Sequence, residues 1–490
     1  MTGTPHRRLT FGFSLFAVAA FALAQAQQES TEPLETLARA LADSGTDSAY
    51  SRLAEFASNH AGDETGAQAA LALGHADHDR RRYTAAIDWY EQAEKSEVLR
   101  EYALLFGARA HRSLGREEQA IALYGRLRSD FPAGVQDATA LEEMADAALA
   151  VGQARKAIEA LEGYAPAASS PVLLLVRARA LQHLNRLEPA AADYAAIYYG
   201  FPLSTEAKTA GAMLTTLRRA HGSTLPSISV EQQVARAEAL FDGDRCTEAR
   251  AEFTRLLPQL TGAKRDRAQL RIARCRVRAG APISVLSRLK VEDPETDAER
   301  LYTLSQTYRS RRQISPMLKA VEEIVARYPQ SRWTEDALYS TGNYYWVELD
   351  RAKAADYYDQ VARKFPFGRN AVAAHWRVTW TTYLEQPEQA AAKFEEHLTR
   401  YRTSTPYTEN ALYWLGRVAE RAGDASRARA FYTKAAERFT QSYYGRQAAD
   451  RLNQMGTGST AEVELLNQIP KATPAPTFAD AAPAAAEPYR

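Results

Sequence analysis

The sequence is short of cysteine, of excess charge and of long apolar runs, and each shortage excludes a class of protein. Two cysteines among 490 residues exclude a small domain held together by several disulfides. Lys and Arg number 61 and Asp and Glu number 60, so the formal net charge of +1 gives no reason to expect a nucleic-acid partner. Apolar residues still make up 46% of the chain, which is enough for a folded core.

Recognisable catalytic and cofactor motifs are also missing. The sequence has no phosphate-binding glycine loop, no nucleophile elbow and no zinc-peptidase helix motif. The best metal candidate is His75 with Asp77, His78 and Asp79, in which the two histidines are three positions apart and share a helix face. Because no further ligand can be located, we interpret this group as a polar helix surface and expect neither a metal nor a cofactor. Neighbouring carboxylates such as Glu322 and Glu323 diverge on a helix, so they cannot flank a glycosidic bond.

The first 26 residues differ from the rest of the chain. A basic start at 6–8 precedes a mostly apolar run over 9–23, and small residues follow at 22–26. This order predicts a secretory signal peptide over residues 1–26 and a periplasmic protein, with an uncleaved N-terminal anchor as the alternative. Since no other segment approaches about 20 unbroken apolar residues, we expect no transmembrane segment after cleavage.

What the sequence has in place of catalytic motifs is a repeat. A small residue returns at intervals of 34, 37 and 33 near the start and of 37, 36 and 38 near the end. These positions are Ala86, Ala120, Ala157 and Ala190, then Met317, Ala354, Ala390 and Ala428. A bulky residue follows four positions later at Tyr90, Tyr124, Leu161, Tyr194, Val321, Tyr358, Phe394 and Tyr432. A small residue followed by a bulky one a turn later suits close helix contacts. The repeat therefore predicts an all-α fold, a curved solenoid of helical hairpins.

Breaks in the repeat suggest a division of the chain. We expect an N-terminal array over 27–222, a joint over 223–229 and a C-terminal array over 230–455. Residues 456–490 are rich in Ala and Pro and have too little apolar bulk to fold, so we expect a disordered linker or tail there.

The two cysteines leave two alternatives open. Cys246 and Cys275 are 29 positions apart, about the distance between helices of neighbouring hairpins. In an oxidising compartment a disulfide between them would contribute about 3 kcal/mol. The alternative is two buried thiols that fill small gaps, and spacing alone does not decide between them.

Aromatic residues are frequent in the C-terminal array. At these spacings they usually lock one helix against the next, but aromatic faces also stack on sugar rings. If the solenoid has a groove, the helix face beside the packing stripe lines it. The predicted ligand-binding residues on that face are Tyr302, Gln306, Tyr339, Asn343, His375, Thr379, Tyr413 and Arg417.

Several strings resemble known families. Leu415–Gly416 with Gly423, Ala428 and Tyr432 matches the tetratricopeptide pattern, so the predicted solenoid is tetratricopeptide-like. More specifically, four segments resemble the helical superhelix of the soluble lytic murein transglycosylases, and the similarity spans about residues 70–455. The four segments are Tyr198–Ser204, Trp376–Trp380, Ala411–Arg417 and Ser442–Gly445.

The resemblance implies an exported protein that binds peptidoglycan glycan strands or positions a cell-wall enzyme. Members of that family carry a further lysozyme-like domain with a catalytic Glu-Ser pair. The only Glu-Ser pair here is Glu29–Ser30, directly after the predicted cleavage site, so we assign no catalytic residue and favour a non-catalytic protein. The alternative is an envelope scaffold that binds other envelope proteins, and a third alternative is an enzyme with an unrecognised site.

Overall fold

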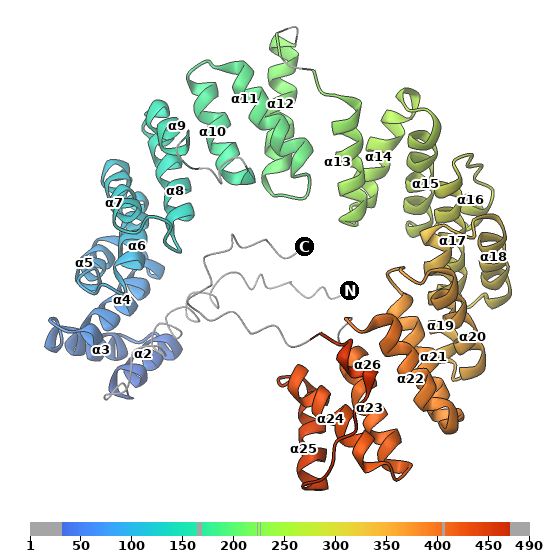
Figure 1. The fold of residues 1–490 in the computed structure, drawn as a ribbon. Coiled ribbons are helices and arrows are strands. Elements are labelled where there is room, and N and C mark those ends of the chain that lie inside the picture. The colour runs from blue at the N-terminus through green and yellow to red at the C-terminus, as the bar shows by residue number, and fades with distance from the viewer. Residues whose placement is uncertain are drawn as a thin grey trace, which may run out of the picture. The chain divides into compact units, whose positions relative to one another are not determined.

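The structure is a computed structural model, and it describes residues 32–162, 164, 169–222, 224–225, 227–403 and 407–470. Over these residues the chain forms 25 α-helices and no strand, which confirms the predicted all-α helical-repeat fold (Figure 1). The predicted signal peptide over 1–26 and the pair Glu29–Ser30 lie outside the described residues. The chain divides into two compact units, residues 1–244 (unit 1) and residues 245–490 (unit 2).

Unit 1 is a series of hairpins in which successive helices from α2 to α12 pack against one another, and α13 packs against η2. Its helices are α2 (Glu32–Ser44), α3 (Asp47–Asn59), α4 (Glu64–Asp79), α5 (Tyr83–Ala93), α6 (Arg100–Ser113), α7 (Glu117–Asp130), α8 (Asp137–Ala150), α9 (Ala154–Glu162), α10 (Pro171–His183), α11 (Leu187–Ala195), the π-helix η2 (Ala196–Gly200), α12 (Glu206–His221) and α13 (Val230–Asp242).

Unit 2 continues the same construction. Its helices are α14 (Cys246–Leu256), the 3₁₀ turn η3 (Leu257–Gln259), α15 (Gly262–Arg278), α16 (Ser284–Ser287), α17 (Pro294–Ser310), α18 (Ile314–Arg327), α19 (Arg332–Val347), α20 (Arg351–Lys364), α21 (Ala371–Glu385), the 3₁₀ turn η4 (Pro387–Gln389), α22 (Ala390–Tyr401), α23 (Tyr407–Arg421), α24 (Ala425–Arg438), α25 (Tyr443–Met455) and α26 (Glu464–Asn467).

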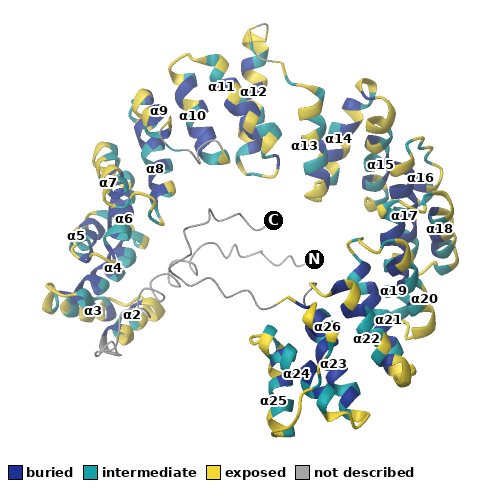
Figure 2. Cartoon of the chain, viewed as in Figure 1, coloured by how far each residue is buried: buried dark blue, intermediate teal, exposed yellow. Residues whose placement is uncertain are grey.

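The repeated small and bulky residues form the core of the hairpins. All seven alanines of the repeat are completely buried, and Met317 is 1% exposed. Gly74 of α4 lies so close to Tyr90 of α5 that a Cβ atom there would be 2.6 Å from the tyrosine ring. Gly416 of α23 faces Tyr432 of α24 in the same way, at 2.4 Å. Buried residues therefore line the faces along which neighbouring helices meet (Figure 2).

The turns inside most of the described hairpins contain one residue in the left-handed region. Gly115, Gly152 and Gly423 take this conformation, with φ of +71°, +75° and +81°. Glycine adopts it without steric cost. Leu349, in the turn between α19 and α20, has φ of +62° although it has a branched side chain.

The boundary between the units differs from the joint expected at 223–229. Helix α13, which we expected to open the second array, belongs to unit 1 and packs against η2. The reason is Arg236, which is 6% exposed. Its guanidinium donates a hydrogen bond to the Tyr198 carbonyl at 2.5 Å and lies 3.5 Å from the centre of the Tyr198 ring.

The end of the C-terminal array also differs from the expectation. Part of the expected tail over 456–490 is folded, because α26 carries Leu466 into the core of unit 2 and Ile469 follows it there. The Ala461 amide donates a hydrogen bond to the Ser426 carbonyl at 3.0 Å. The remaining residues of that tail, 471–490, lie outside the described residues.

Two further features of the structure are a disulfide and the apolar character of its helices. Cys246 of α14 and Cys275 of α15 form a disulfide, with their Cα atoms 5.2 Å apart. Among the described helices, none combines the length and the apolar character that crossing a membrane requires.

Candidate binding surfaces

The eight residues predicted to bind a ligand lie on four helices of unit 2. Each first helix of a hairpin carries two of them: α17 carries Tyr302 and Gln306, α19 carries Tyr339 and Asn343, α21 carries His375 and Thr379, and α23 carries Tyr413 and Arg417. Helix α17 contacts α19 and α21 contacts α23. The structure thus brings the predicted residues onto equivalent helices.

Three of the eight side chains are buried. His375 is 4% exposed, Thr379 is completely buried and Tyr413 is 5% exposed. Tyr413 packs against the rings of Tyr432 and Tyr444. In this structure these three side chains are covered by neighbouring helices, and their predicted role in ligand binding stays a prediction.

The partly exposed residues are engaged within the protein. The Gln306 side chain donates a hydrogen bond to the Ser340 hydroxyl at 2.7 Å, which ties α17 to α19. Asn343 accepts a hydrogen bond from the Tyr358 hydroxyl at 2.7 Å. These contacts stabilise the stacking of hairpins.

The other three partly exposed residues also contact neighbouring side chains. Tyr302 stacks on Trp333, and the Tyr339 ring lies 5.6 Å from the Tyr358 ring. Arg417 donates to the Tyr413 hydroxyl at 3.4 Å.

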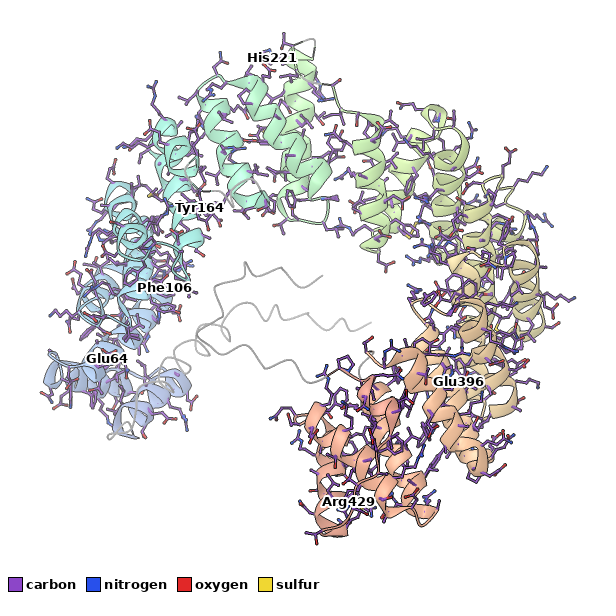
Figure 3. The ribbon with its side chains drawn as sticks, in the orientation of Figure 1. Glu64, Phe106, Tyr164, His221, Glu396 and Arg429 are labelled. Atoms are coloured by element: carbon purple, nitrogen blue, oxygen red, sulfur yellow. A yellow bond between two sulfur atoms is a disulfide. The ribbon has the colours of Figure 1, made fainter. Side chains whose placement is uncertain are left out.

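His375 belongs to a buried histidine pair that sequence reasoning did not find. Its Nδ1 lies 3.0 Å from Nδ1 of His397 on α22. Its Nε2 lies 3.6 Å from the carboxylate of Glu396, which is labelled in Figure 3. Burial lowers the pKa of His375, and burial together with the charge of His375 lowers the pKa of His397 to about 3. The other charged or polar groups near the pair are Lys393, Arg400 and Tyr401 from α22, Thr379 from α21 and Tyr407 from α23.

The earlier metal candidates His75 and His78 lie in unit 1. His75 is largely buried and packs against Tyr90 and Phe106, and its Nδ1 lies 3.1 Å from the Tyr90 hydroxyl. Burial lowers its pKa to about 4. Within the described part of the chain, no three His, Cys, Asp or Glu side chains converge as metal ligands. His75 is therefore a packing residue and not part of a polar surface.

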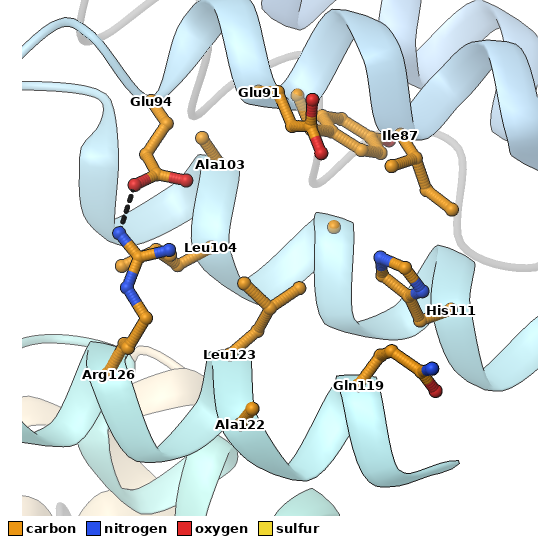
Figure 4. Close-up of a pocket in the computed structure, with 12 residues that line it drawn as sticks. Ile87, Glu91, Glu94, Ala103, Leu104, His111, Gln119, Ala122, Leu123 and Arg126 are labelled. Atoms are coloured by element: carbon orange, nitrogen blue, oxygen red, sulfur yellow. Dashed lines mark hydrogen bonds and ion pairs between the residues drawn. The ribbon is translucent and has the colours of Figure 1, made fainter. Parts of the chain in front are cut away.

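Unit 1 has a pocket between α5, α6 and α7, which we call the α5–α7 pocket. Its volume is about 310 Å³. The Glu94–Arg126 ion pair lies at one end and His111 with Gln119 at the other, and Glu91 projects between them (Figure 4). The apolar residues that line it are Ile87, Ala103, Leu104, Ala122 and Leu123.

A second pocket of unit 1 is lined by side chains from α6, α8, α10 and α12, and its volume is about 270 Å³. Arg112 bridges Glu117 and Asp146, at 3.1 and 3.0 Å. Burial raises the pKa of Glu142, and the nearby carboxylates Glu143, Asp146 and Glu206 raise it further. This pocket is therefore already crossed by ion pairs.

The charges of the chain are divided unequally between the units. Residues 32–244 contain 21 Lys or Arg and 30 Asp or Glu, a net charge of −9 with neutral histidines. Residues 245–470 contain 36 Lys or Arg and 27 Asp or Glu, a net charge of +9. Our sequence interpretation missed this because the two halves cancel in the whole-chain charge. Counting the halves separately would have found it.

Comparisons with known proteins agree with the repeats. The family model for the tetratricopeptide repeat matches residues 336–367 and 410–442, which cover most of the α19–α20 and α23–α24 hairpins. No curated protein matches this sequence.

The chain is also similar to several solved structures. Yeast Tom70 is similar at 12% identity over 79% of this chain and 95% of its own, with a TM-score of 0.30. The Naa15/Naa10 complex bound to HypK matches at 15% identity over 90% of this chain and 75% of its own, with a TM-score of 0.30. A tetratricopeptide repeat protein from Parabacteroides merdae matches at 14% identity over 58% of this chain and 98% of its own, with a TM-score of 0.25. TM-scores of this size do not establish a common superhelical shape. The chain is thus an all-α helical-repeat protein in which two hairpins are recognised as tetratricopeptide repeats.

Proposed function

We propose that this chain is an exported, non-catalytic scaffold of the periplasm that binds a protein partner through its helical repeats. The observation that carries the proposal is the pair of hairpins recognised as tetratricopeptide repeats within a solenoid of such hairpins. Solenoids present extended surfaces that suit protein partners. Export rests on the signal-like segment over residues 1–26.

Binding of peptidoglycan is the second candidate. It rests on the resemblance to lytic transglycosylases and on one local feature of unit 2. Tyr344, Tyr345 and Trp346 at the end of α19 are partly exposed, and the guanidinium of Arg377 lies 4.6 Å from the Trp346 ring. Exposed aromatic faces of this kind stack on sugar rings. We rank it second because three of the residues expected to bind glycan are buried.

The experiment that separates the two candidates uses the mature chain from residue 27. Cross-linking in envelope extracts followed by mass spectrometry identifies a partner, which is then purified and titrated against the chain by calorimetry. Binding of the purified partner with a micromolar or lower Kd supports the scaffold.

Sedimentation of the chain with purified sacculi is the parallel measurement. Two results together would overturn the scaffold proposal in favour of peptidoglycan binding. The chain would co-sediment with sacculi in a way that Trp346→Ala abolishes, and no purified partner would bind it. Release of anhydromuropeptides by the pure chain would instead show an enzyme.

A further inference from the structure

One carboxylate in a pocket of unit 1 has no hydrogen-bond or ion-pair partner among the described residues. Glu91 lines the α5–α7 pocket and is exposed, and it makes no hydrogen bond or ion pair with any described residue. The other acidic residue of the pocket, Glu94, is already paired with Arg126 (Figure 4). One carboxylate of the pocket is therefore left for a partner.

The imidazole at the other end of the pocket does not compensate this charge. Nδ1 of His111 is buried and has no hydrogen-bond partner among the described residues. Burial and the nearby charge of Arg116 lower the pKa of His111 by more than the charge of Glu91 raises it, so the ring is neutral at neutral pH. The pocket thus keeps a net negative charge.

The floor of the pocket is apolar. Ala103 and Leu104 of α6 are 2% and 1% exposed, and Leu123 of α7 is partly exposed beside them. Lys and Arg side chains bury their methylene stems along such surfaces while the charged end stays at the rim. An apolar floor below a single carboxylate fits a side chain of this kind.

The charge of the whole unit favours the same partner. Unit 1 carries nine more acidic than basic side chains over residues 32–244, whereas residues 245–470 of unit 2 carry nine more basic ones. Such a field attracts cationic segments and repels anionic ones. The local and the unit-wide charge therefore agree in sign.

We propose that unit 1 binds a basic segment of the partner protein, and that a Lys or Arg side chain of that segment occupies the α5–α7 pocket. The methylene groups of that side chain lie on Leu104 and Leu123, and its charged end pairs with Glu91. This proposal rests on the proposed scaffold function and names the chemistry of its partner.

The test uses the mature chain and three fluorescein-labelled peptides, in which Ser alternates with Lys, with Glu or with Leu. Fluorescence anisotropy at low salt is expected to show binding of the Lys–Ser peptide only. Glu91→Lys is expected to weaken that binding about tenfold, the loss of one well-placed charge contact. Ala122→Trp, at the exposed edge of the pocket, is expected to weaken it similarly without changing the charge.

Glu159→Lys is the matched control, because Glu159 is exposed on α9 of the same unit and does not line the pocket. It makes the same change of charge and is expected to change the affinity less than twofold. Thermal unfolding of all three variants checks that they fold.

Equal weakening by Glu91→Lys and Glu159→Lys would overturn the proposal, because the peptide would then be held by overall charge alone. Binding of the Glu–Ser peptide would overturn it as well. A Leu–Ser peptide that loses affinity with Ala122→Trp but not with Glu91→Lys would show an apolar occupant instead.

The purified partner identified above distinguishes this proposal from the scaffold function. If the partner binds the chain equally well with and without Glu91→Lys, the proposed scaffold function is supported and the proposed occupancy of the α5–α7 pocket is overturned. If no purified partner binds and the chain sediments with sacculi, the scaffold function itself fails.

Discussion

Unit 1 and unit 2 share one core pattern but have opposite surfaces. In both, a bulky residue of the second helix lies against the first helix, as Tyr90 does with Gly74 and Tyr432 with Gly416. Outside that core, unit 1 is acidic over residues 32–244, whereas unit 2 is basic over residues 245–470 and buries three of the residues predicted to bind a ligand. The difference teaches that a repeat pattern determines the core while leaving the surface free to diverge.

The repeated tyrosines share a buried ring, but their hydroxyl groups donate to different acceptors. The hydroxyl of Tyr124 in unit 1 donates to the carboxylate of Glu143 at 2.6 Å. The hydroxyl of Tyr358 in unit 2 donates to the amide oxygen of Asn343 at 2.7 Å. The ring position is shared, whereas the acceptor of the hydroxyl varies within each unit, because Tyr194 of unit 1 donates to the amide oxygen of Gln182 and Tyr432 of unit 2 donates to the carboxylate of Glu420.

The largest expected effect comes from emptying the shared core. Tyr124→Ala in unit 1 and Tyr358→Ala in unit 2 each remove a completely buried ring. We expect each to lower the free energy of unfolding by about 3–5 kcal/mol, the usual cost of truncating a buried aromatic residue. Hydrogen exchange measured by mass spectrometry reports the loss for each unit separately. A loss below about 1 kcal/mol in either unit would show that its hairpins do not share this core.

The disulfide is expected to have the next largest effect, and in unit 2 alone. Both cysteines of the chain, Cys246 and Cys275, lie there. Replacing both by serine removes a constraint on the unfolded chain worth about 3 kcal/mol for a loop of this length. We expect faster hydrogen exchange in α14 and α15 and unchanged exchange in α4 and α5. Reduction of the wild-type chain with dithiothreitol is the control and is expected to reproduce the effect.

Acid is expected to destabilise unit 2 through the pair His375 and His397. The pKa of both is lowered by burial, so the folded state stays neutral where the unfolded chain takes up protons. Above pH 6.5 both histidines are neutral in the folded and the unfolded chain, so neither reduces the free energy of unfolding. As the pH falls from there toward 3, the unfolded chain takes up protons that the folded state does not, and the free energy of unfolding falls. For His397 we expect about 2 kcal/mol less stability at pH 5 than at pH 7.5. The measurement is urea unfolding of the chain at the two pH values, followed by hydrogen exchange in α21 and α22.

Two histidine variants test this assignment. His397→Gln removes the titrating group and is expected to flatten the pH dependence of α21 and α22. His221→Gln is the matched control, because His221 is exposed on α12 of unit 1, and it is expected to leave that dependence unchanged. An unaltered pH dependence with His397→Gln would exclude His397 as its source.

The core could be predicted from sequence because it depends on local spacing. Ala354 and Tyr358 are four residues apart and meet the same neighbouring helix, so their burial follows from helical geometry alone. Three of the predicted ligand residues are buried for a physical reason. Helix α23 is covered by α21, α22, α24 and α25, so the face beside its packing stripe is also buried at Tyr413. The sequence of one hairpin does not determine how closely the next hairpin packs against it, so the burial of its outer face could not be predicted.

The α5–α7 pocket and the histidine pair could not be predicted for a related reason. His375 and His397 are on α21 and α22, and the 3.0 Å between their Nδ1 atoms depends on how those helices pack. Glu91 and Leu123 are on different hairpins and meet only because α6 lies between α5 and α7. Of the observations that support the pocket proposal, only the net charge of unit 1 could have been counted from the sequence.

The smallest expected effect concerns the turns inside the hairpins. Leu349 in unit 2 has φ of +62° and a side chain that is 78% exposed, whereas Gly115 and Gly152 take this conformation in unit 1. A left-handed residue with a Cβ atom costs about 1–2 kcal/mol, and glycine recovers part of that at some cost in the entropy of the unfolded chain. We expect Leu349→Gly to raise the stability of unit 2 by about 0.5 kcal/mol. Urea unfolding of the variant measures this, and Gly423→Leu in the α23–α24 turn is the reverse change. A gain in stability with Gly423→Leu would contradict the role assigned to these turns, because its φ of +81° would then carry no steric cost.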